Sequence, residues 1–249
     1  MPLSDIISES EAIISESEFR GLTLRLIGGI GVWHACPSAA EPPFKRGYKD
    51  IDVIGTGKEL RAISDFFMER GYRANQRFNA QYGGRRLVFI DDANDRRVDV
   101  FLDRFEMAHK FDFRGRLLLC KPALPVSDLL MSKLQIVKMD ENDVKDVLVI
   151  FLDHEIGTDP CRDIEIKYIT AYTSSDWGIY RTFTDNLTRA LQHLSTLSDY
   201  NDLKVTLDKK ILAFASEMEK SPKTARWKIR SAIGTRKKWY EDVSDVLEQ

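Results

Sequence analysis

The sequence lacks the features that mark a membrane protein or a cysteine-rich secreted domain. No run approaches the roughly 20 consecutive apolar residues that a membrane-spanning helix needs. The first 19 residues are acidic and rich in serine, which is the wrong composition for a signal or transit peptide. Three cysteines in 249 residues are too few and too scattered for a cysteine framework or a zinc site. We therefore expect a cytoplasmic protein with no membrane partner.

Several common catalytic motifs are also absent. The sequence contains neither a Walker phosphate-binding loop nor a G-x-S-x-G nucleophile motif. Its four histidines show no metal-ligand spacing. With 43% hydrophobic and 31% charged residues, the chain has the composition of a globular protein. Its length suits one large domain or two small ones with a substantial core.

Three apolar segments each carry residues that are unusual within a buried strand. Gly28-Gly29 ends the segment 22–27, Asp50 and Asp52 lie within 49–54, and Asp99 lies within 97–102. Because strand side chains alternate between faces, Asp50 and Asp52 point to the same side. Burying unpaired carboxylates costs several kcal/mol, so these groups must stay solvated or bind a cation. Carboxylate oxygens are hard ligands, and the pattern predicts a Mg²⁺ site.

The order of these motifs resembles that of the DNA polymerase β-like nucleotidyltransferase superfamily. In that family a glycine turn opens a helix and contacts a nucleoside triphosphate (NTP), and a DxD pair with a third carboxylate holds two metal ions. The resemblance implies that Gly28 and Gly29 bind the nucleotide, and that Asp50, Asp52 and Asp99 are catalytic residues that bind Mg²⁺. It covers roughly the first 60 per cent of the chain. The implied fold is a mixed twisted sheet flanked by helices.

The segments between these motifs predict further elements of an α+β domain. Residues 1–20 predict a packed helix, and residues 58–70 predict a second helix that stops at Gly71. Residues 72–90 predict a β-hairpin that turns at Gly83-Gly84. Its basic residues favour a solvated strand face over a phosphate-binding role; they are Arg77, Arg85 and Arg86.

Residues 124–154 predict a helical hairpin, in which Asp140 caps the second helix and Asp143 completes a capping box. The sequences LLMSKL and KDVL are similar to a helical segment of type IV toxin-like nucleotidyltransferases. That resemblance implies a nucleotide-binding role for Lys133 and matches Lys145-Asp146 to a family pair. Val149 stands where that subfamily carries an aspartate, which weakens the subfamily assignment.

Beyond residue 156 the pattern becomes helical. Gly157, Asp159 and Pro160 predict a linker, so we expect a nucleotidyltransferase-like domain at 1–156 and a small helical domain at 157–249. Apolar residues at helical spacing predict three helices, the last running from Ser221-Pro222 to Leu247.

Residues 220–238 carry a basic segment with no acidic residue, and this composition suits a nucleic-acid backbone. Trp227 within it and Trp239 directly after it favour inward packing. Two functions therefore remain. The first is transfer of a nucleoside monophosphate from an NTP to an acceptor, with RNA favoured over a protein hydroxyl or a small molecule. The alternative is a non-catalytic module that binds RNA or a partner protein through the helical domain. The sequence leaves the choice of NTP and the oligomeric state open.

Overall fold

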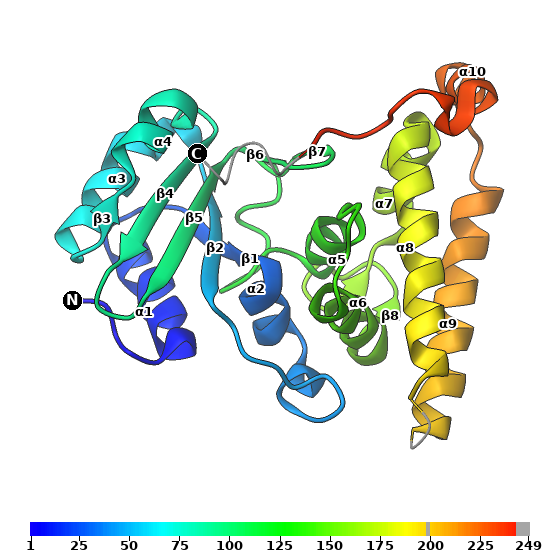
Figure 1. Cartoon of the computed structure of the whole chain (residues 1–249), viewed down its shortest axis with the longest axis horizontal. Helices are drawn as coiled ribbons and strands as arrows, with labels where there is room; N and C mark the ends of the chain where they lie inside the picture. Colours follow the sequence, from blue (N-terminus) through cyan, green and yellow to red (C-terminus); the bar gives the residue numbers. More distant parts are fainter. Residues whose placement is uncertain (198–199, 243–249) are drawn as a thin grey trace. The chain divides into compact units, whose positions relative to one another are not determined.

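The computed structural model describes residues 1–197 and 200–242, and two compact units can be distinguished in it (Figure 1). The first unit contains residues 1–35, 45–106 and 110–125, and the second contains 36–44, 107–109 and the chain from 126 onward. The expected α+β class, with a mixed sheet flanked by helices and a helical C-terminal part, is confirmed. The longest continuous part of the second unit begins at residue 126. The domain boundary that the sequence predicts after residue 156 stays a prediction.

The first unit is built on a five-stranded mixed sheet. Its strands are β1 (Leu24–Ile27), β2 (Asp50–Gly55), β3 (Arg73–Ala74), β4 (Arg86–Asp91) and β5 (Arg96–Leu102). They lie in the order β1-β2-β5-β4-β3, and β2 and β5 are parallel while the other neighbours are antiparallel. The helices of this unit are α1 (Ile6–Phe19), α2 (Gly28–Ala35), α3 (Leu60–Glu69) and α4 (Gln76–Tyr82). A small hairpin follows the sheet, formed by β6 (Arg104–Glu106) and β7 (Lys110–Asp112).

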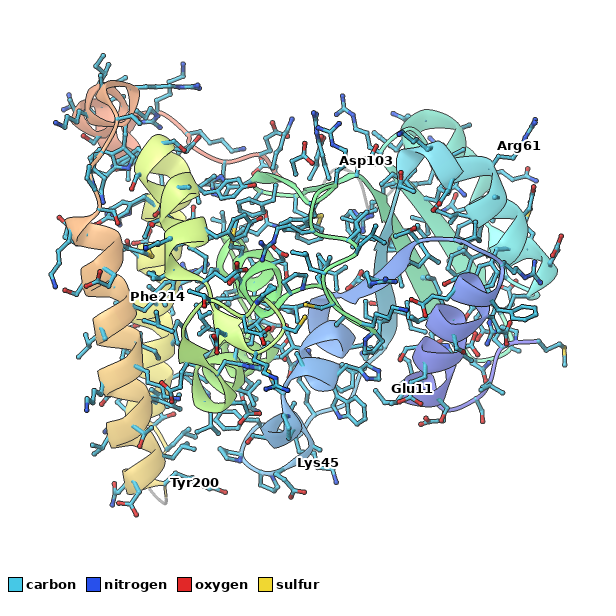
Figure 2. All side chains as sticks on the ribbon, turned by 180° about the vertical axis from the view of Figure 1, so that it is seen from behind. Glu11, Lys45, Arg61, Asp103, Tyr200 and Phe214 are labelled. Carbon is cyan, nitrogen blue, oxygen red and sulfur yellow. The ribbon has the colours of Figure 1, made fainter. Side chains whose placement is uncertain are left out.

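One face of the sheet is apolar and is covered by α3. Val98 of β5 is paired with Phe89 of β4, and the Phe89 ring stacks on Phe67 of α3 with centroids 4.8 Å apart. The solvent side of α3 carries Arg61, which points away from the sheet (Figure 2). Alternation along the strands therefore leaves Asp50 and Asp52 of β2, and Arg97 and Asp99 of β5, on the other face, where the candidate site lies.

A buried ion pair anchors α1 to the end of α3. Glu9 is fully buried and accepts hydrogen bonds from Arg70 Nε at 2.9 Å and Nη2 at 2.8 Å. The Tyr72 hydroxyl donates to the same carboxylate at 2.7 Å. These bonds outweigh the cost of burial, and the pKa of Glu9 lies below its usual value. The expected N-terminal helix is thus present and has a specific polar attachment.

The prediction of a β-hairpin over residues 72–90 was wrong in detail. β3 and β4 are antiparallel neighbours, but α4 is inserted between them, and β3 is only two residues long. Asn75 caps α4 by accepting a hydrogen bond from the Phe78 backbone at 3.1 Å. Asn79 then bonds both backbone groups of Val88 on β4. Beyond the two residues of β3, contacts between α4 and β4 therefore take the place of the expected strand pairing.

The second unit is mostly helical. Its helices are α5 (Val126–Leu134), α6 (Glu141–Asp153), α7 (Ile166–Ser175), α8 (Trp177–Ser195), α9 (Asn201–Lys220) and α10 (Ala225–Ile233). The predicted capping box at Asp140 and Asp143 is present at the start of α6. Phe214 of α9 lies against Phe151 of α6, with centroids 5.2 Å apart (Figure 2). The expected linker, with Gly157, Asp159 and Pro160, lies between two short parallel strands, β8 (Glu155–Ile156) and β9 (Asp163–Ile164).

The final helix is shorter than the sequence predicted. α10 ends at Ile233, because Gly234 adopts a φ of 60° and a 3₁₀ turn follows over Gly234–Arg236. The predicted continuation through Val243 and Leu247 lies outside the described residues. Among the described residues, no helix combines the length and apolar character required to cross a bilayer.

Candidate active site

Strand register brings three predicted carboxylates to one face of the first unit's sheet. Asp52 of β2 is paired directly with Asp99 of β5, and Asp50 is paired with Arg97. Paired residues of neighbouring strands project to the same side, and Asp50 lies two residues before Asp52. The structure therefore gathers Asp50, Asp52 and Asp99 on the face opposite Val98 and Val100.

The glycine turn lies directly against this carboxylate face. β1 ends at Ile27, which is paired with Asp52, and α2 begins at Gly28. Gly28 has a φ of 67°, a conformation that L side chains rarely adopt. A Cβ atom added at Gly28 would lie 2.2 Å from Asp52 Oδ2. Only glycine lets the start of α2 approach the carboxylate this closely, and the turn leaves backbone N–H groups of a helix N-terminus beside it.

Arg46 covers the second glycine of the turn. A Cβ atom at Gly29 would lie 2.1 Å from Arg46 Nη2 and 3.2 Å from Tyr48 Cε1. The Arg46 guanidinium also stacks over the Tyr48 ring, 4.2 Å from its centroid. A positive charge is thus held next to the glycine turn. Arg46 is not predicted from the sequence, because it lies in a loop rich in proline and glycine, where no periodic pattern marks a functional residue.

Two arginines hold Asp99, which is only 4% exposed. Arg86 of β4 contacts Asp99 Oδ1 through Nε at 2.9 Å and Nη2 at 2.8 Å. Arg97 contacts Oδ1 through Nη2 at 2.8 Å and Oδ2 through Nε at 2.8 Å. Both oxygens of this carboxylate therefore have a cationic partner. The prediction that Arg86 lies on a solvated strand face was wrong, because its side chain is only 12% exposed and forms an ion pair with Asp99.

The electrostatics of Asp50 differ from those of Asp99. Asp50 keeps contact with solvent at the start of β2. Its pKa is raised above the usual aspartate value, first by partial desolvation and then by the nearby negative charge of Asp99. The positive charges of Arg97 and Lys49 act in the opposite direction. The charge of Asp99 therefore acts on Asp50 across the two neighbouring strands.

The donor chemistry of Asp50 and Asp52 fits a magnesium ion. Both provide carboxylate oxygens on one strand face, beside a backbone that approaches without a side chain. Asp99 is adjacent but is engaged by the two arginines. Across residues 1–197 and 200–242, no three acidic, histidine or cysteine side chains converge as a ready metal site. Asp103, the residue directly after β5, accepts a hydrogen bond from the Gly57 backbone at 3.1 Å (Figure 2).

Lys133 belongs to the second unit, where it joins two helices. Its Nζ on α5 lies 3.0 Å from Asp143 Oδ1 and 2.8 Å from Asp146 Oδ2 on α6. These two negative charges raise the pKa of the buried lysine despite its desolvation. Lys145 instead pairs with Glu141 on the surface of α6. The expectation that Lys133 binds nucleotide stays a prediction, and its ion pairs provide it with a structural role.

Comparisons with known proteins give structural neighbours but no sequence relative. No protein-family model matches the sequence, and no curated protein matches it. The lincosamide antibiotic adenylyltransferase LnuA, solved with lincomycin bound, aligns with a TM-score of 0.40 and 15% identity. The alignment covers 56% of this chain and 92% of LnuA.

The antibiotic-resistance factor ANT(2'')-Ia aligns with a TM-score of 0.42 and 13% identity, covering 67% of this chain and 92% of that protein. Both neighbours belong to the polymerase β-like nucleotidyltransferase superfamily, which the sequence motifs resemble. At these identities and TM-scores the likeness by itself assigns neither an activity nor a residue to this chain.

Proposed function

We propose that the protein is a Mg²⁺-dependent nucleotidyltransferase that moves a nucleoside monophosphate from an NTP to an acceptor. The observation that carries this proposal is the contact between the glycine turn and the carboxylate face. Gly28 lies against Asp52, which is paired with Asp99 and shares its strand face with Asp50. Backbone donors suited to phosphate therefore adjoin carboxylates suited to a divalent cation.

Each group has a defined part in the proposed reaction. The N–H groups at Gly28 and Gly29 bind the triphosphate, and Asp50 and Asp52 are the residues that would hold Mg²⁺. The acceptor oxygen forms a bond to the α-phosphorus, the bond to pyrophosphate breaks, and the acceptor proton is released. Bound Mg²⁺ would supply charge stabilisation at the attacking and leaving oxygens. Asp99 lies nearest to Asp52 in register and serves as the third carboxylate at the acceptor side.

Isothermal titration with a panel of NTPs, with and without Mg²⁺, tests this function. We expect at least one NTP to bind only when the metal is present. The variant Asp50→Ala/Asp52→Ala should weaken that binding by more than about tenfold, or 1.4 kcal/mol. Asp65→Ala is the matched control, since Asp65 is an exposed carboxylate on α3. Absence of NTP binding in all conditions, or equal binding by the double variant, would contradict the proposal.

RNA is the acceptor that we favour, and the basic segment at residues 220–238 supports it. Its exposed cations include Arg226, Lys228, Arg236 and Lys237. Trp227 packs edge-on against Tyr180 and Trp239 against Trp177, so they are engaged in packing and the segment offers charge for a phosphate backbone. Protein hydroxyls and small molecules, such as the lincosamide on which LnuA acts, are the competing acceptors to include in a transfer assay.

The alternative is a non-catalytic module that keeps the fold and binds RNA or a protein through its helices. The same basic segment favours that alternative. The non-catalytic alternative would be supported over transfer if the protein shows no metal-dependent NTP binding and Asp50→Ala/Asp52→Ala binds RNA as well as the wild type does. Location in the cytoplasm and the toxin-like subfamily remain predictions from the sequence.

A further inference from the structure

We propose that Arg97 is an exchangeable partner of Asp99, which makes divalent-cation binding depend on the nucleotide. This inference rests on the proposed function. Without nucleotide, the Arg97 guanidinium occupies the third carboxylate. When the NTP binds, the guanidinium moves to its phosphates, and Asp99 becomes available to the cation site of Asp50 and Asp52.

The carboxylate of Asp99 is already bound by two arginines. Two guanidiniums bind this one carboxylate, with four contacts of 2.8 to 2.9 Å that involve both oxygens. A cation that approached Asp99 would have to displace them. The two arginines also lower the attraction of this sheet face for a cation, because the three carboxylates and the two guanidiniums together carry one net negative charge. Binding of a divalent ion alone is therefore disfavoured.

The two arginines are held differently, which identifies the one that moves. Arg86 stacks over the Phe101 ring at 4.7 Å and faces the Phe78 ring at 5.9 Å, and its side chain is 12% exposed. Arg97 is paired across the sheet with Asp50, and its side chain is 26% exposed. Arg86 is thus fixed between aromatic rings, whereas Arg97 has access to solvent beside the cation site.

Triphosphate is a suitable second partner for Arg97. Guanidinium forks bind carboxylates and phosphates with the same planar bidentate geometry, so exchange between the two needs no change in protonation. A triphosphate arrives with more negative charge than a single carboxylate. It therefore compensates Arg97 and leaves Asp99 with an open oxygen facing the cation. Cation and nucleotide then bind with positive coupling, and by linkage each raises the affinity of the other.

Mn²⁺ binding, followed by electron paramagnetic resonance without any turnover, tests this coupling. The proteins compared are the wild type, Arg97→Gln, Arg97→Lys and, as a surface control, Arg73→Gln. Arg73 pairs with Asp92, and both side chains are about 60% exposed. Without nucleotide, Arg97→Gln should bind Mn²⁺ about tenfold more tightly than the wild type, because Asp99 has lost a competing cation. The Mn²⁺ affinities of Arg97→Lys and Arg73→Gln should stay within about threefold of the wild-type affinity.

A non-hydrolysable NTP analogue provides the second arm. It should raise the Mn²⁺ affinity of the wild type at least about tenfold and that of Arg97→Gln much less. The exchange is overturned if the wild type and Arg97→Gln bind Mn²⁺ with equal affinity in the absence of nucleotide. If Asp50→Ala/Asp52→Ala then loses Mn²⁺ binding, the proposed function stays intact. Binding of neither Mn²⁺ nor NTP by any protein overturns both.

Discussion

At the scale of single residues, the candidate site depends on a glycine that no other residue can replace without strain. Gly28 combines a φ of 67° with an approach to Asp52 that leaves no room for a Cβ atom. The first property is conformational and the second is steric. Each would destabilise an alanine at this position, and the second would also displace a proposed metal ligand.

We expect Gly28→Ala to lower the free energy of unfolding by about 2 kcal/mol or more, since the left-handed conformation alone costs about 1 to 2 kcal/mol for a residue with a Cβ. Metal-dependent NTP binding should weaken at the same time. Chemical denaturation and calorimetric titration measure the two effects. Gly84→Ala is the control, because nothing lies within 4 Å of a Cβ there and its φ is not positive. A Gly28→Ala protein as stable as Gly84→Ala would refute the steric argument.

At the scale of elements, a charged cluster connects α5 with α6 in the second unit. Lys133 contributes one positive charge, and Asp143 and Asp146 contribute two negative charges. Asp143 also closes the capping box with Asp140, so the start of α6 and its attachment to α5 share a residue. The resemblance to toxin-like enzymes matched Lys133 and Asp146 to a functional pattern, and the structure shows that the two residues contact each other.

Removal of the buried lysine should therefore destabilise the helix pair. We expect Lys133→Met to lower the free energy of unfolding by about 3 kcal/mol, because it leaves buried carboxylates without their cation. Lys145→Met on α6 is the control, because its partner Glu141 is exposed and the pair contributes less than about 1 kcal/mol. Denaturant titration compares them. Equal stability of the two variants would show that the buried cluster does not hold the helices together.

NTP titration of folded Lys133→Met would at the same time test the nucleotide-binding role that the sequence predicted. Unchanged affinity would restrict Lys133 to the structural role that its ion pairs indicate. A loss of affinity in protein that remains folded would instead place the lysine in the nucleotide site.

At the scale of the whole molecule, charge is distributed unevenly. The chain has a formal net charge of −2, yet residues 220–238 carry eight basic residues and no acidic one. Some of these cations are engaged locally: Arg230 donates to the carbonyls of Gly234 and Lys237, and Lys223 lies over the rings of Tyr180 and Trp227. The exposed remainder is a candidate contact for a polyanion.

If the acceptor is RNA, its binding should be salt-dependent and should require this segment. Replacing four exposed cations by glutamine should reduce the slope of log K against log salt by about 3 for single-stranded RNA; they are Arg226, Lys228, Arg236 and Lys237. The control replaces four exposed cations elsewhere, Lys45, Arg61, Lys167 and Lys209. Fluorescence anisotropy with labelled RNA measures both slopes. Equal slopes for the two variants would exclude the basic segment as the RNA contact.

The sequence by itself determined the features that depend on neighbours along the chain. Alternation in β2 placed Asp50 and Asp52 on one face because strand geometry has a period of two residues. The glycine turn after β1 and the capping box of α6 also follow from residues a few positions apart. The likeness of the motif order to a known superfamily was available at this level too.

Only the tertiary structure decided which distant residues meet. The insertion of α4 depends on Asn79 reaching Val88, and the β8/β9 pair forms across an expected linker. Above all, the contact of Asp99 with Arg86 depends on the β4–β5 register, which strand sequences alone do not specify, whereas Arg97 precedes Asp99 by two residues on the same strand. Local patterns fix which face a side chain takes. The partner that it finds there depends on long-range packing, and for Asp99 that partner changes the expected chemistry of the site.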